Sequence, residues 1–418
     1  MAGAIAGKQG MSKPVAEGPE WKRLLSKTEQ ESVNRVFQDE RIAPILESIR
    51  KNAPHIYEGL QDHVLMETNF TGFPAEVFDE LMGKDQQRVM RSQMTKALDE
   101  RVLGILRQPG VRDGLVGAMH TSGMAKGTAE VVVDEFLKTG VMAQHVYARA
   151  ERQLYPEAEK EGRRPVDRFI EKRDSKATEA LMRAVLEQVK WIPYEGKQVS
   201  VKELAQLAYF GSTLKKEVTL EYLTPDQFSA LWSDVYKSAV EGGRINPAAT
   251  SLEAYLATRV GVTMSTIMVE EGGKESHSIV VNGSLEGVMT ISYVLSTYMH
   301  ETGHVRIPRG TEGRGELQNV ILEGICEDIP RVGLEEMEKA FPKVPFEACG
   351  WIAGHHVSGA VYVFGRVFAG TLRDISGVEL YQKLILPGLQ LVATEGGEKE
   401  FAHFLKIADE RIGAEKRG

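Results

Sequence analysis

The chain has 418 residues, of which 42% are hydrophobic and 26% charged, and its formal net charge is −8. This is the composition of a globular protein with a large core, and the acidic balance excludes a general nucleic-acid binder, which needs surplus Lys and Arg to neutralise phosphates. Two cysteines are too few for a disulfide framework and indicate a reducing compartment, so we expect a cytoplasmic protein.

The N-terminal part of the chain is predicted to be helical. Residues 1–20 are small, Gly-rich and polar and lack the apolar core of a signal peptide, so we expect a flexible tail. From residue 21 to residue 190, apolar residues recur at three- and four-residue spacings, which predicts a helical domain over 21–190 with a break at Pro109. The most apolar stretch, 285–298, is too short to span a bilayer, so we expect no membrane association.

The pattern changes after Trp191, which places a second domain at residues 191–418. A short strand is predicted at 198–201. Residues 262–269 and 276–281 are rich in β-branched side chains and flank a glycine turn, as in an antiparallel hairpin. The sequence therefore predicts an α+β fold, mainly α, with a helical N-terminal lobe and a C-terminal lobe that contains a small antiparallel sheet.

A candidate metal site lies at the end of a predicted buried helix. Residues 285–305 are apolar nearly all round and end in the motif HETGH. Residues i and i+4 of a helix share a face, so His300 and His304 can bind one metal ion, and Glu301 can take a proton from the water that the metal activates. One zinc ion per chain is the expected cofactor. The alternative is a pair of structural histidines beside an incidental glutamate.

A third metal ligand is predicted at Glu323, which follows His304 after 18 intervening residues. The intervening segment contains one proline and three glycines, which suits a loop that joins two helices. Glu327 lies one turn beyond Glu323 and can accept the outer N–H of either histidine, with Asp328 as the neighbouring candidate. The alternative is a solvated acidic helix face. Cys326, on the same helix, is expected to be a small buried residue, and the alternative is a thiol that touches the metal site.

The motif HExxH, followed by 18 intervening residues and a glutamate, resembles the gluzincin zinc metallopeptidases. The glycine of HETGH and the mostly helical body are most similar to their thimet-oligopeptidase and Taq-carboxypeptidase branches. The similar region covers residues 262–370 and includes 355–366 (HHVSGAVYVFGR), the counterpart of a histidine-containing segment that these branches carry downstream of the motif. Residues 362–365 (YVFG) are also similar to the small tubulin-detyrosinating zincins. The resemblance implies a zincin-like catalytic lobe that hydrolyses peptide bonds in a peptide or protein substrate.

Further site residues are implied by this resemblance. A histidine or tyrosine beyond the metal is expected to stabilise the oxyanion of the tetrahedral intermediate, and the candidates are His355, His356 and Tyr362. Arg366 and Arg373 follow on the same predicted helix, where a guanidinium can bind the terminal carboxylate of a substrate. The alternative for each arginine is a surface salt bridge.

The resemblance also implies a substrate-binding strand at residues 276–281. An edge strand pairs with an extended peptide, and here we expect that pairing to involve Val280 and Asn282. The alternative is an ordinary member of the sheet, with His277 at the surface. The sequence thus predicts a zinc metallopeptidase with Glu301 as general base. The alternative function is a catalytically silent zincin-like module that binds or regulates a partner.

Overall fold

The computed structural model describes residues 39–60, 99–140, 176–214, 218–243, 245–257, 264–271, 274–282, 291–307, 315–342 and 360–415. It is mainly helical, with one two-stranded and one three-stranded sheet, so the predicted α+β fold, mainly α, is confirmed. The tail predicted over 1–20 lies outside the described residues. None of the described helices is both long and apolar enough to span a membrane.

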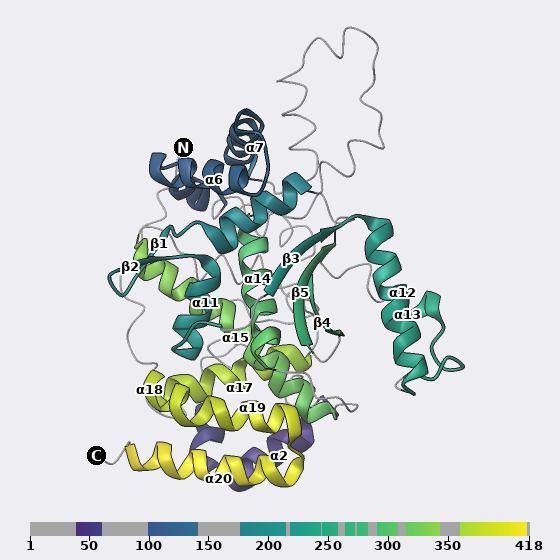
Figure 1. Ribbon diagram of the computed structural model, residues 1–418. Coiled ribbons are helices and arrows are strands. Elements are labelled where there is room, and N and C mark those ends of the chain that lie inside the picture. The colour runs from purple at the N-terminus through teal and green to yellow at the C-terminus, as the bar shows by residue number, and fades with distance from the viewer. Residues whose placement is uncertain are drawn as a thin grey trace, which may run out of the picture.

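The N-terminal helices include α2 (Ala43–Asn52), α6 (Pro109–Thr121) and α7 (Lys126–Thr139). Helix α6 begins at the predicted break, because the N–H that a proline lacks would have no partner within the helix at this first position. Helix α2 packs beside the C-terminal helix α20 (Glu398–Glu415), and Asp409 of α20 accepts a hydrogen bond from the backbone N–H of Ile56 (Figure 1). One apolar core includes residues on both sides of residue 190, and the division into two domains there stays a prediction.

Beyond the π-helical turn η2 (Ala184–Gln188), strands β1 (Ile192–Tyr194) and β2 (Lys197–Val199) form a hairpin, which confirms the first two residues of the predicted strand. The next residues belong to helix α11 (Val201–Phe210). That helix begins there because Ser200 Oγ accepts a hydrogen bond from the backbone N–H of Glu203, whose carboxylate accepts one from the N–H of Ser200.

The larger sheet contains β3 (Val218–Leu223), β4 (Met264–Glu271) and β5 (Lys274–Asn282), in the order β3-β5-β4. Strands β4 and β5 are antiparallel, which confirms the predicted hairpin. Strand β3 pairs in parallel with the other edge of β5, over His277–Asn282. The prediction of an edge strand at 276–281 is therefore wrong, because β5 is the central strand. The backbone of Val280 pairs on both sides, with Glu221 and Ser265, and is not available to a peptide.

The two faces of this sheet pack against different helices. Helix α14 (Ile291–Arg306) lies on one side of the sheet, and α12 (Pro225–Glu241) lies on the other, next to α13 (Leu252–Ala257) (Figure 1). Successive side chains of a strand point to opposite faces, so Val280 packs with Phe228 and Trp232 of α12, while Ile279 and Val281 enter the main core. Asn282 is fully buried. His277 is only 3% exposed, so its predicted surface position is also wrong.

The C-terminal half is built on α15 (Glu316–Ala340), which packs against both α14 and α17 (Ala360–Ser376). The remaining elements are α18 (Val378–Leu380), η4 (Tyr381–Ile385) and α19 (Leu386–Glu395). Glycines permit these close approaches. A Cβ on Gly303 of α14 would lie 2.6 Å from Ile329 Cδ1, and a Cβ on Gly324 of α15 would lie 2.2 Å from the carbonyl oxygen of Gly365 in α17. Helix α15 is thus held tightly between its two neighbours.

Candidate metal centre

Helix α14 brings the two motif histidines together. His300 and His304 are one turn apart, and their Nε2 atoms are 3.0 Å apart. The imidazole of His304 is 4% exposed and that of His300 is 15% exposed. The pair therefore lies mostly in the protein interior, with His300 the more exposed of the two.

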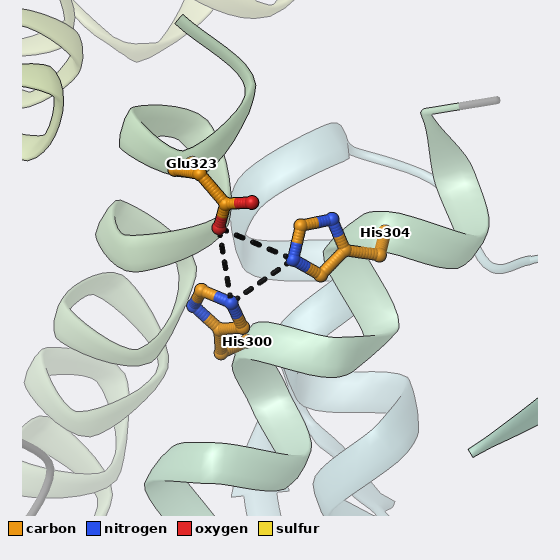
Figure 2. Close-up of side chains that lie close together, drawn as sticks. All are labelled: His300, His304 and Glu323. Atoms are coloured by element: carbon orange, nitrogen blue, oxygen red, sulfur yellow. Dashed lines mark hydrogen bonds and ion pairs between the residues drawn. The ribbon is translucent and has the colours of Figure 1, made fainter. Parts of the chain in front are cut away.

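The carboxylate of Glu323 reaches the same point from α15. Its Oε2 atom lies 3.6 Å from Nε2 of His300 and 3.4 Å from Nε2 of His304. Figure 2 shows the three side chains pointing toward one another from the two helices. Among the described residues, these three form the group that can hold a metal ion, with all their ligand atoms within 4.8 Å of one another. The predicted ligand set is thus brought together.

The spacing of these atoms fits a small tetrahedral ion. Zinc binds imidazole nitrogen and carboxylate oxygen at about 2.0–2.1 Å, and a tetrahedral arrangement then separates the ligand atoms by about 3.3–3.4 Å. The three observed separations, 3.0, 3.4 and 3.6 Å, bracket that spacing. Two imidazoles with one carboxylate also suit zinc better than magnesium or calcium, which prefer oxygen ligands.

The outer nitrogen of His300 faces a second carboxylate of α15. Its Nδ1 atom lies 3.3 Å from Oε1 of Glu327, so Glu327 is the predicted acidic partner of a histidine, and that histidine is His300. Burial lowers the pKa of the His300 imidazole, but the negative charge of Glu327 and of the two other nearby glutamates outweighs burial and raises that pKa to about 9. The site therefore favours a positive charge at this position.

Asp328, the other candidate partner, belongs to a separate ionic cluster. Its fully buried carboxylate accepts a 2.6 Å hydrogen bond from Nε of Arg331 and lies 3.7 Å from Nε of Arg373. Both arginines also contact Glu335, so the cluster links α15 to α17. The alternative prediction of a surface salt bridge for Arg373 is wrong, because its side chain is only 11% exposed and pairs in the interior.

The outer nitrogen of His304 has a different neighbour. Its Nδ1 atom lies 3.5 Å from Sγ of Cys326, and both residues are buried. The expectation that Cys326 is buried is confirmed, and its contact with His304 agrees with the alternative of a cysteine that touches the candidate metal site. Its position three residues after Glu323 on one helix is the signal that points to such a contact.

Glu301 is held by a residue that the sequence analysis did not single out. Thr266 of β4 has its hydroxyl 2.8 Å from Oε2 of Glu301 and 2.9 Å from the backbone carbonyl oxygen of the same residue. A hydroxyl has one proton, so it donates to one of these two acceptors at a time. Both residues are buried, and this contact connects the sheet to the motif helix.

The structure describes only part of the remaining predicted site residues, which lie between positions 355 and 366. His355 and His356 lie outside the described residues, and Tyr362 lies on α17 with its side chain outside the description. Arg366 is on α17 and only 3% exposed, so it is not a surface residue, and its role in substrate binding stays a prediction.

Comparisons of the chain with protein-family models, with curated proteins and with solved structures find no match. The likeness to gluzincins stays a prediction from the motif, and the assignment of a function depends on the residues of the site.

Proposed function

We propose that the protein is a zinc-dependent metallopeptidase of the gluzincin type. The observation that carries this proposal is the convergence of two imidazole nitrogens and one carboxylate oxygen, from α14 and α15, at the spacing of a tetrahedral ion. A glutamate adjacent to the first histidine, as the hydrolytic motif requires, supports it further.

The residues of the site have distinct roles in this proposal. His300, His304 and Glu323 hold the ion. A zinc ion bound there supplies a Lewis acid that polarises a carbonyl group and lowers the pKa of water. Glu301 accepts a proton from the attacking water and returns it to the leaving amine. Thr266 orients this carboxylate by donating to Oε2, which leaves the other oxygen to exchange the proton.

The strand that can bind an extended peptide in this proposal is β4. No strand among the described residues pairs with the edge of β4 that faces away from β5. Thr266 of β4 contacts Glu301, so a peptide along this edge runs beside the catalytic carboxylate. Pairing between backbones recognises an extended chain with little dependence on its side chains. We therefore propose extended peptide or protein segments as the substrate class.

The variant Glu301→Gln tests this function, with a tryptic digest of a cell proteome as the substrate mixture and mass spectrometry to detect new peptide ends. We expect the variant to keep its zinc and to lose hydrolysis by at least about 100-fold, the usual contribution of a general base. Glu316→Gln is the matched control, because Glu316 is half-exposed in the first turn of α15.

Two results would contradict the proposal. Hydrolysis by Glu301→Gln at the wild-type rate would exclude this residue as the base. A wild-type protein that binds zinc but cleaves no peptide and retains a bound partner would favour the silent binding module instead.

A further inference from the structure

We propose that Cys326 is a positioning residue of the metal centre, whose sulfur accepts the outer N–H of His304 and holds that imidazole in the orientation in which it binds the ion. This inference rests on the proposed metal site and adds to it a role for a side chain that is not itself a ligand.

The geometry at His304 supports this role. Nε2 of His304 is the atom that lies close to His300 and Glu323, so it is the nitrogen that binds a cation. A neutral imidazole that binds a metal through Nε2 carries its proton on Nδ1. That Nδ1 atom is 3.5 Å from Sγ of Cys326, within the range of a hydrogen bond to sulfur. The thiol is therefore placed to accept the proton that fixes the tautomer.

One face of α15 supplies three side chains that contact the histidines. Glu323, Cys326 and Glu327 follow one another at the i, i+3 and i+4 spacing of a helix face. The first contacts both Nε2 atoms, the second contacts Nδ1 of His304, and the third contacts Nδ1 of His300. The position of Cys326 within this face places its sulfur at the site, between two carboxylates that contact the same pair of histidines.

The packing of α14 on α15 brings the sulfur within reach. Gly303 precedes His304, and a Cβ at this position would lie 2.9 Å from Sγ of Cys326 and 3.3 Å from its Cα. Any other residue at position 303 would therefore force the two helices apart or displace the sulfur. The glycine of HETGH thus allows the approach that the contact between Cys326 and His304 needs.

The two histidines consequently have unequal support. A carboxylate such as that of Glu327 is a strong acceptor, whereas a thiol sulfur is a weak one. We expect loss of the sulfur to weaken zinc binding, because partners of ligand side chains commonly contribute 10- to 100-fold to metal affinity. We expect an effect near the lower end of that range, about tenfold, since the acceptor is weak.

The test measures the zinc dissociation constant by competition with a chelator, in the full chain. Cys326→Ala is expected to raise the dissociation constant about tenfold, and Cys326→Ser, which keeps an acceptor, is expected to stay within about threefold of the wild type. Val332→Ala is the matched control, because Val332 is buried on α15 nine residues from Glu323 and on the opposite side of the helix. It creates a cavity but is expected to change zinc affinity by less than about twofold.

Spectra of the cobalt-substituted protein provide a second readout. We expect Cys326→Ala to shift the visible absorption bands of the bound cobalt, and we expect the wild type to show no sulfur-to-cobalt charge-transfer band. Such a band would make Cys326 a ligand and overturn the proposal. Unchanged zinc affinity in Cys326→Ala, or equal losses in the alanine and serine variants, would also overturn it. A wild-type protein that binds no zinc would overturn both this inference and the proposed function, whereas the other outcomes leave the function intact.

Discussion

The contact between Gly324 and Gly365 holds the helix of the third candidate ligand, Glu323, and replacing Gly324 by alanine tests its importance. The new Cβ would lie 2.2 Å from the carbonyl oxygen of Gly365 and 2.6 Å from its Cα, whereas ordinary van der Waals contact begins at 3.4 Å. These neighbouring atoms are all backbone, so no side chain can rotate away. Helices α15 and α17 must therefore separate by about 1 Å, in an interior that is packed without spare volume.

The size of the effect follows from this displacement. Overpacking of a core costs about 1–3 kcal/mol, and we expect the upper end here because backbone has to move. The higher helix propensity of alanine offsets at most about 1 kcal/mol of this cost. We therefore expect Gly324→Ala to lower the free energy of unfolding by about 2 kcal/mol. Because Glu323 adjoins Gly324, we also expect zinc affinity to fall about tenfold.

The assay is urea unfolding in the presence of a chelator, followed by zinc titration of the folded protein. Gly117→Ala is the control, because Gly117 lies inside α6 and a Cβ there would meet no atom within 4 Å. We expect this control to match the wild type or to exceed its stability by up to about 1 kcal/mol. If Gly324→Ala is as stable as Gly117→Ala and binds zinc as tightly, the reasoning about α15 and α17 is refuted.

Three further predictions concern Thr266, His300 and Asp328. Thr266→Val, which removes the hydroxyl that donates to Glu301, is expected to lower kcat about tenfold without changing KM or zinc content. Thr266→Ser keeps a hydroxyl and is expected to restore kcat, whereas an unchanged kcat in Thr266→Val would exclude the role of Thr266 in orienting Glu301. Without metal, the pKa of His300 is about 9 in the folded protein and 6.5 in the unfolded chain. The protonated imidazole therefore stabilises the fold fully below pH 6.5, and this stabilisation is lost as the pH rises toward 9. Relative to His300→Asn in chelator, the free energy of unfolding should fall by about 1.4 kcal/mol per pH unit in this window, and a parallel course for both proteins would contradict this. Asp328→Asn deprives the mostly buried Arg331 and Arg373 of their shared carboxylate. We expect urea unfolding to show a loss of about 3 kcal/mol in the free energy of unfolding, and a loss below about 1 kcal/mol would argue against the ionic cluster.

The three candidate metal ligands were predictable because their arrangement depends mainly on helix geometry. The four-residue spacing of His300 and His304 places both side chains on one face of any helix. The 18-residue gap leaves room for a turn and for a second helix that carries Glu323. Once α14 and α15 pack together, the partnership of Glu327 with a histidine follows from its position one turn beyond Glu323.

The position of β5 in its sheet was not predictable from its own residues. Strand β3 pairs with β5 across more than 50 residues of intervening chain, and this parallel pairing leaves no local pattern in either strand. The alternation of buried Val218, Leu220 and Tyr222 does indicate a strand, but it does not identify the neighbour. A hairpin of β4 and β5 alone would leave one edge of β5 open, and the pairing with β3 is what makes β5 central.

Contacts between elements account for the other differences. Thr266 meets Glu301 only because β4 packs against α14, and no spacing in the sequence relates the two residues. Asp328 and Glu327 are adjacent acidic residues, and a helix turns their side chains about 100° apart, one toward His300 and the other toward two arginines. The sequence predicts either Glu327 or Asp328 as the partner of a motif histidine. The packing of α15 against α14 and α17 decides between them, because it directs Glu327 to His300 and Asp328 to the arginines.

The measurement that tests the central claim most directly is the zinc content of protein purified without chelator, determined by elemental mass spectrometry beside the double variant His300→Ala/His304→Ala. We predict about one zinc ion per wild-type chain and none in the variant, since both imidazoles contribute ligand atoms. A wild-type protein that contains no zinc, and takes up none when zinc is added back, would contradict the account.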